Sequence, residues 1–176
     1  MTKAARITRI AVGTVLLFLG AELSLPATNP PFTLTTLSLF IVSALLSPKD
    51  AFASSVIYLV LGALGVPVFA NFTSGLGILF GIGGGFFISF PFMAFFSSLL
   101  LRKFAKTFIP RFSVFFIMTL ASYVVEALWL IITKMSGLGV GGILASYVLP
   151  FIYVDVIKCA LAPFIISKIE GMIKKW

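Results

Sequence analysis

Two charged side chains three residues apart, Asp155 and Lys158, lie within an apolar stretch near the C-terminus. Residues i and i+3 of a helix share one face, so both side chains should enter the same environment. A single charge at the centre of a bilayer costs roughly 2.5–3.5 kcal/mol on insertion scales. We therefore expect the pair to face a protein interior or a polar cavity, either as part of a binding site or as an ion pair that joins two helices.

The composition places the whole chain in a membrane. Of the 176 residues, 60% are hydrophobic and 10% are charged, and the mean hydropathy is +1.19. Soluble domains average roughly 45–50% apolar and about 25% charged residues. The chain is therefore expected to be an integral membrane protein.

Several classes of chemistry are disfavoured by what the chain lacks. It has no histidine, one cysteine and five dispersed acidic residues, so we expect neither a metal site nor a cofactor. Without nucleophile, base or metal clusters, an enzyme is also disfavoured. The net charge of +8 is concentrated next to the apolar segments, which indicates topology signalling and not nucleic-acid binding.

Six apolar segments predict an all-α protein of one membrane domain, residues 1–176, with six transmembrane helices. The expected spans are about residues 10–25, 32–47, 51–66, 81–101, 112–133 and 143–166. The first has the form of a signal-peptide core, but five more follow, so we interpret it as a spanning helix. The second would form only about 24 Å of helix, less than the ~30 Å hydrocarbon thickness.

The distribution of lysine and arginine predicts the orientation. With both termini cytoplasmic, all of the 13 basic residues except Lys134 and Lys158 fall on the cytoplasmic side, as the positive-inside rule requires. The outer half of the bundle then contains Glu22, Glu126 and the loop around Asn71, and the Asp155/Lys158 pair lies near or somewhat past the midpoint of the last span. These polar groups converge as in a pocket loaded from outside.

Three motifs of the sequence are distinctive: PFTLTTL at 31–37, YLVLGALGVPVFA at 58–70 and PFIYVDVIK at 150–158. Together they resemble motifs of the BioY family, the biotin-binding S components of energy-coupling-factor (ECF) transporters. The first is similar to the family's Pro-Phe-Thr-Leu-Gln-Thr-Leu, the second is a close match to another family motif, and the third resembles the Asp-x-x-Lys segment of the family's last helix. The chain departs from the family at Thr35, Phe86 and Tyr153. The resemblance implies an S-component-like bundle.

The resemblance also implies a binding site. Biotin offers two ureido N–H donors, a carbonyl acceptor, an apolar thioether ring and a carboxylate, and each needs a complementary group. Asn71, Asp155 and Lys158 match positions expected to contact biotin. The hydroxyls of Thr33 and Thr36 are further candidates.

Aromatic side chains are candidates for the apolar walls of that site: Phe69, Phe86, Tyr153 and Trp129. Alternatives remain for two polar residues. Asn71 would alternatively be a turn residue, and Glu126 would either line the cavity or neutralise Lys134. Glu22 is expected near the membrane interface.

The implied function is capture of biotin at the outer face of a bacterial-type plasma membrane and its delivery inward, without covalent chemistry. Transport energy would come from a separate coupling transmembrane protein and ATPase subunits. An S component for thiamine or riboflavin, and a solitary biotin transporter, are the alternatives. Loop 68–80 is expected to act as a lid, and the basic loop 102–111 to contact the coupling protein or anionic lipid of the bilayer.

Overall fold

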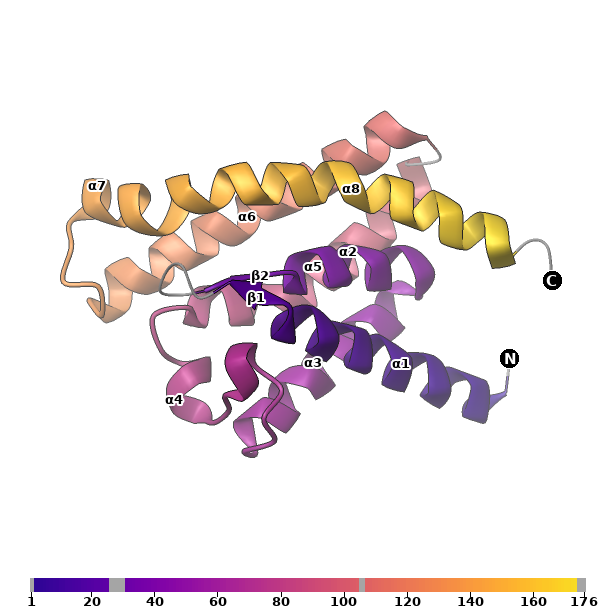
Figure 1. The fold of residues 1–176 in the computed structure, drawn as a ribbon, viewed down its shortest axis with the longest axis horizontal. Helices are drawn as coiled ribbons and strands as arrows, with labels where there is room; N and C mark the ends of the chain where they lie inside the picture. The colour runs from indigo at the N-terminus through magenta and orange to yellow at the C-terminus, as the bar shows by residue number, and fades with distance from the viewer. Residues whose placement is uncertain (1, 26–30, 105–106, 174–176) are drawn as a thin grey trace.

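The structure, a computed structural model, describes residues 2–25, 31–104 and 107–173. It is a bundle of helices with one small hairpin (Figure 1). The first half consists of α1 Lys3–Glu22, the antiparallel strands β1 Ser24–Leu25 and β2 Phe32–Thr33, α2 Thr35–Leu45 and α3 Pro48–Ala63. The second half consists of the short helices η1 Ala70–Phe72 and α4 Leu76–Leu79, then α5 Gly84–Phe104, α6 Phe108–Thr133, α7 Val140–Ile143, η2 Leu144–Val148 and α8 Leu149–Ile173.

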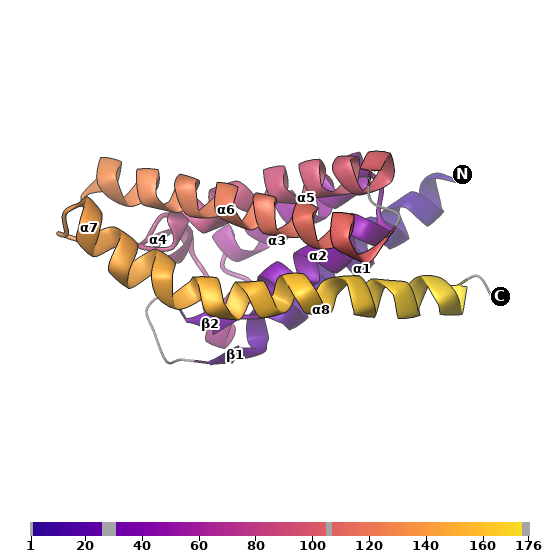
Figure 2. The ribbon, with the colours of Figure 1, turned by 90° about the horizontal axis from the view of Figure 1, so that it is seen from above.

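The long helices α6 and α8 run side by side along one side of the bundle, and α1 and α3 form the opposite side (Figures 1 and 2). Between these two sides, α2 packs on α1 and α8, and α5 packs on α3 and α6. The first turns of α1 and the last turns of α8 lie at the same end of the bundle (Figure 1). This arrangement agrees with the predicted topology, in which both termini are on one side.

The expected spans are matched closely by position but not all by length. Within the described ranges, four stretches of helix are long and apolar enough to cross a membrane: Lys3–Glu22, Gly84–Phe104, Phe108–Thr133 and Val140–Met172. The second and third predicted spans correspond to α2, of 11 residues, and α3, of 16 residues. The chain is therefore a multi-pass membrane protein, and the count of six spans is only roughly matched.

The shortness of α2 has a consequence for the site. Its 11 residues form roughly 16 Å of helix, about half the hydrocarbon thickness. The hairpin and Leu34 lead the chain from the end of α1 into the start of α2. Gly20 makes this close entry possible, because a Cβ there would lie 2.9 Å from the carbonyl oxygen of Leu34.

Ion pairs and a hydrogen bond join helices at the basic end of the bundle. Arg6 of α1 pairs with Asp50 of α3 at 2.7 Å, and Arg111 of α6 pairs with Glu170 of α8 at 2.8 Å. Arg102 donates to the carbonyl oxygen of Leu46 at 2.9 Å. The positive-inside rule assigns this end to the cytoplasm.

Asp50 is the buried member of its ion pair, with a relative exposure of 4%. Burial raises the pKa of its carboxyl group, but hydrogen bonds from Arg6 and Ser47 and the charges of Arg6 and Arg9 lower it more. The net pKa lies below the ordinary value of 3.8. Asp50 is therefore a negative charge near neutral pH, in the first turn of α3, where it also favours the helix dipole.

Candidate ligand-binding site

A cavity opens between the outer parts of the helices, away from the end that contains the Arg6/Asp50 and Arg111/Glu170 ion pairs. The empty space within it, counted together with the open solvent at its mouth, is about 690 Å³. Its lining comes from the last turn of α1, the start of α2, the outer part of α3, the first turns of α5, the middle of α6 and the first half of α8. Of the polar groups predicted to converge on one pocket, Asp155 and Lys158 line this cavity, whereas Glu22, Asn71 and Glu126 do not.

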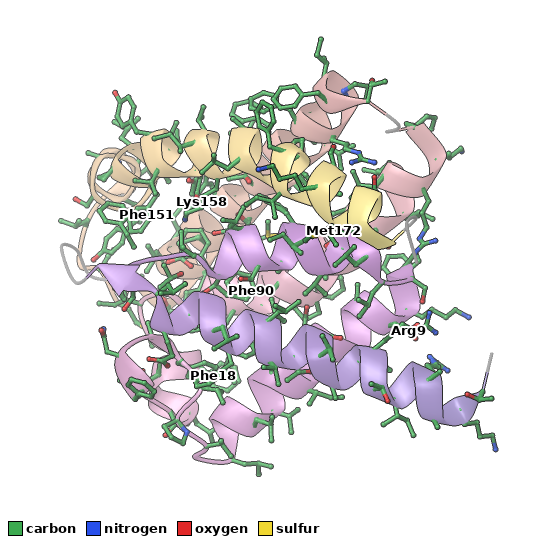
Figure 3. The ribbon with its side chains drawn as sticks, turned by 45° about the vertical axis from the view of Figure 1, so that its right-hand side comes forward. Arg9, Phe18, Phe90, Phe151, Lys158 and Met172 are labelled. Carbon is green, nitrogen blue, oxygen red and sulfur yellow. The ribbon has the colours of Figure 1, made fainter. Side chains whose placement is uncertain are left out.

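Asp155 and Lys158 both line the cavity and face each other. Lys158 Nζ lies 2.6 Å from Asp155 Oδ1, and the two residues are 7% and 5% exposed. Figure 3 shows Phe151 and Lys158 on the side of α8 that faces α2. The helical spacing therefore brings the two charges into one enclosed space, as expected.

Two further side chains complete a polar network around the pair. The Tyr123 hydroxyl of α6 donates to Asp155 Oδ2 at 2.5 Å, and Lys158 Nζ donates to Thr36 Oγ1 at 3.4 Å. Each carboxylate oxygen retains acceptor capacity, and the three-donor ammonium retains one N–H. The network can therefore accept hydrogen bonds from ligand N–H groups and donate one to a ligand oxygen or carboxylate.

Three threonines stand at the entrance to α2 and line the cavity. Thr33 and Thr36 were predicted from the sequence, whereas Thr35 was noted only as a departure from the family motif. The Thr33 and Thr35 hydroxyls lie 2.9 Å apart. Because Lys158 of α8 donates to Thr36, this hydroxyl cluster lies next to the charged pair, and the polar groups of the cavity come from two elements.

Aromatic rings form most of the apolar wall. Phe86 was predicted and lines the cavity, together with Phe87, Phe90, Tyr58 and Phe151. Phe69 is buried behind this wall, with ring centroids 5.5 Å from Tyr58 and 4.7 Å from Phe87. The structure therefore places Phe69 in support of the wall and not on its surface.

Besides Phe69, two predicted site residues are not brought to the cavity. Tyr153 is 75% exposed, because it precedes Asp155 by two residues and so points about 200° away around the helix. Asn71 is exposed in a left-handed turn at φ 58°, and its Oδ1 accepts a hydrogen bond from the Ser24 hydroxyl at 3.1 Å. Its neighbour Ala70 does line the cavity.

The carboxylates of Glu22 and Glu126 both accept hydrogen bonds from backbone N–H groups. Glu22 accepts from the Phe72 N–H at 3.1 Å, which attaches the 70–73 turn to the end of α1. Glu126 Oε2 accepts from the Phe86 N–H at 2.9 Å, at the start of α5. Among the described residues, Glu126 neither lines the cavity nor pairs with Lys134, so the structure supports neither predicted role. Trp129 likewise lies behind the wall, and its indole N–H donates to the Gly81 carbonyl oxygen at 2.9 Å.

Ser122 and Tyr123 were not predicted from the sequence. Both are polar residues on an apolar 26-residue helix, and Glu126 follows them by four and three residues. That spacing places all of them on one side of the helix. This polar face on an otherwise apolar spanning helix is the sequence pattern that could have identified Ser122 and Tyr123.

These features define a class of protein: a multi-pass helical membrane protein with an internal small-molecule site in its outer half. Comparison with known proteins gives the family. A model of the BioY family matches residues 1–175, and the chain belongs to that family.

Individual relatives extend this finding. The chain is 33% identical to the "Probable biotin transporter BioY" of Pyrococcus horikoshii, over 96% of this chain and 98% of that protein. It is 32% identical to the "Biotin transporter BioY2" of Lactococcus lactis, over 91% and 87% of the two chains. The structure is similar to a crystal structure of the S-component for biotin from an ECF-type ABC transporter, with a TM-score of 0.82 and 25% identity over 97% of this chain and 95% of the other. The S-component-like fold expected from the motifs is confirmed.

Proposed function

We propose that this protein is the biotin-binding membrane subunit of a vitamin-uptake transporter, which captures biotin at the outer face for import. The observation that carries the proposal is the buried Asp155/Lys158 pair in an apolar-walled cavity of the outer half. The relatives named as biotin transporters support the choice of ligand.

The groups of the cavity complement those of biotin. The ureido N–H donors suit the remaining acceptor capacity of Asp155, and the valerate carboxylate suits Lys158 together with the hydroxyls of Thr33 and Thr36. The apolar bicyclic ring suits a wall that includes Phe86. None of these interactions needs a nucleophile or a metal, in keeping with transport without covalent chemistry.

Asn71 is proposed to contact the ligand from the mouth of the cavity. It follows Ala70, which lines the cavity, in loop 68–80. A rotation of the 70–73 turn would present the Asn71 amide, which has both a donor and an acceptor, to a ureido edge. The loop would then close over bound ligand as a lid.

We further propose that the chain is a single membrane domain in a bacterial-type plasma membrane, energised by a coupling transmembrane protein and ATPase subunits. The similarity to an S-component from an ECF-type transporter supports this assignment. A solitary transporter is the alternative. Uptake of labelled biotin in cells that lack other biotin uptake, with and without co-expressed coupling protein and ATPases, separates the two.

The decisive experiment is equilibrium binding of labelled biotin to the purified protein in detergent. We expect saturable binding that unlabelled biotin displaces and thiamine or riboflavin does not. Asp155→Asn should weaken it strongly, whereas Glu170→Gln, the same kind of change at the cytoplasmic end of α8, should leave it unchanged. Absence of binding by folded wild-type protein, or displacement by another vitamin, would refute biotin as the ligand.

A further inference from the structure

Three residues on one side of α6 hold other parts of the site without lining the cavity. Tyr123 donates to Asp155, Glu126 accepts from the Phe86 N–H, and Trp129 donates to the Gly81 carbonyl oxygen. They follow one another at intervals of three residues, so they form a continuous stripe along the helix. We call this set the α6 stripe.

The α6 stripe holds both ends of residues 81–86, which comprise the turn before α5 and the first three residues of α5, and which we call the 81–86 turn. Gly83 and Phe86 of this turn line the cavity, and the turn lies at the outer side. The contact with α6 is close, because a Cβ on Gly84 would lie 2.7 Å from the Trp129 ring and one on Gly85 would lie 2.5 Å from Glu126 Cα. The turn thus rests directly on the helix with no room for side chains between them.

Glu126 is the central member of the stripe and is 0% exposed. One carboxylate oxygen holds Phe86, while Oε1 has no hydrogen-bond partner among the described residues. Burying a carboxyl group with one oxygen unsatisfied is unfavourable. A gain in folding stability therefore does not explain the buried Glu126 carboxylate. What its one hydrogen bond does is fix the position of the 81–86 turn.

The stripe also connects the turn to the charged pair. The rings of Phe86 and Tyr123 pack edge to face with centroids 5.8 Å apart, and Tyr123 holds Asp155. A shift of the turn would therefore disturb both the outer wall and the orientation of the carboxylate.

We propose that Tyr123, Glu126 and Trp129 are positioning residues that hold the 81–86 turn against α6 and thereby set the rate at which ligand leaves the cavity. This inference rests on the proposed function for the identity of the ligand. When the turn is released, a smaller fraction of the protein has the closed wall, and the apparent affinity falls in proportion to that fraction. The loss appears mainly as faster dissociation.

The test compares Glu126→Leu with Glu126→Gln. Leucine cannot accept the Phe86 N–H, whereas the glutamine amide oxygen can. We expect Glu126→Leu to raise the biotin dissociation rate about tenfold, the upper end of the effect of losing one ordinary hydrogen bond. Glu126→Gln should stay within about twofold of wild type by the same reasoning. Trp129→Phe, a milder change that removes only the N–H donor and part of the ring, should also accelerate dissociation.

A control separates positioning from general stability. Val114→Ala removes buried apolar volume from the same helix, roughly 18 Å from Glu126, and should lower the melting temperature with no change in the dissociation rate. If Glu126→Leu and Trp129→Phe behave like Val114→Ala, the inference is overturned while the proposed function stands.

A second readout does not depend on biotin. Hydrogen exchange of the Phe86 amide in ligand-free protein should be faster in Glu126→Leu than in wild type and unchanged in Glu126→Gln. If wild-type protein binds no biotin, the proposed function fails and this measurement alone decides the inference. Equal exchange in all three proteins would overturn it.

Discussion

Replacement of Asp155 and Lys158, singly and together, tests whether the pair contacts ligand or only joins structure. Asp155→Asn leaves the Lys158 ammonium in a site where it is 5% exposed, without the partner that lies at 2.6 Å. Lys158→Met leaves the opposite charge unpaired. The double variant removes both charges and retains side chains of similar size.

The expected magnitude follows from this burial. Breaking a buried ion pair by removing one partner costs about 3–5 kcal/mol, whereas removing both charges is often neutral. At roughly 2–4 °C per kcal/mol for a chain of this size, each single variant should melt about 6–20 °C lower than wild type. The double variant should recover most of this loss.

Biotin affinity, unlike the melting temperature, should not recover in the double variant. If Asp155 accepts the ligand N–H groups, the double variant still lacks charge-assisted hydrogen bonds worth about 1.5–3 kcal/mol. Its affinity should then be weaker than that of wild type by about 10–150-fold, even though its melting temperature has recovered.

The assay pairs thermal unfolding in detergent with equilibrium biotin binding for the four proteins. The Arg111/Glu170 pair provides the control cycle, because it joins α6 and α8 and neither residue lines the cavity. A double variant that recovers both stability and wild-type affinity would refute a ligand contact and leave the pair a structural role.

Further predictions concern packing, pH and thiol reactivity. Gly62→Ala, where a Cβ would overlap the Phe69 ring, should lower the melting temperature and weaken biotin binding, whereas Gly77→Ala, with no neighbour within 4 Å, should change neither. Because the pKa of Asp50 is lowered in the folded protein, its contribution to stability is complete above about pH 3.8 and is lost as the pH falls through the lowered pKa. Wild-type protein should therefore lose more stability than Asp50→Asn on acidification below pH 4, and equal losses measured by thermal unfolding would contradict this. Cys159 is 0% exposed and should react with a maleimide only on unfolding, so rapid labelling of the folded protein would show that its surroundings open.

The class, the topology and the principal charged pair were predictable from the amino-acid sequence. Apolar composition and the distribution of lysine and arginine depend on the bilayer and not on side-chain packing, so they can be interpreted without a structure. The cost of a buried charge and the i, i+3 spacing were enough to identify Asp155 and Lys158. The family motifs added the S-component fold.

Only the tertiary structure decided which side of each helix faces the cavity. In a membrane, both the lipid-facing and the packed faces of a helix are apolar, so hydrophobic periodicity carries little information about orientation. Tyr153 was therefore expected at the site but is exposed, while Tyr123 was missed although it holds Asp155. Glu126 shows the same limit, because its role depends on the 81–86 turn of α5, 40 residues away in the chain, against which α6 packs.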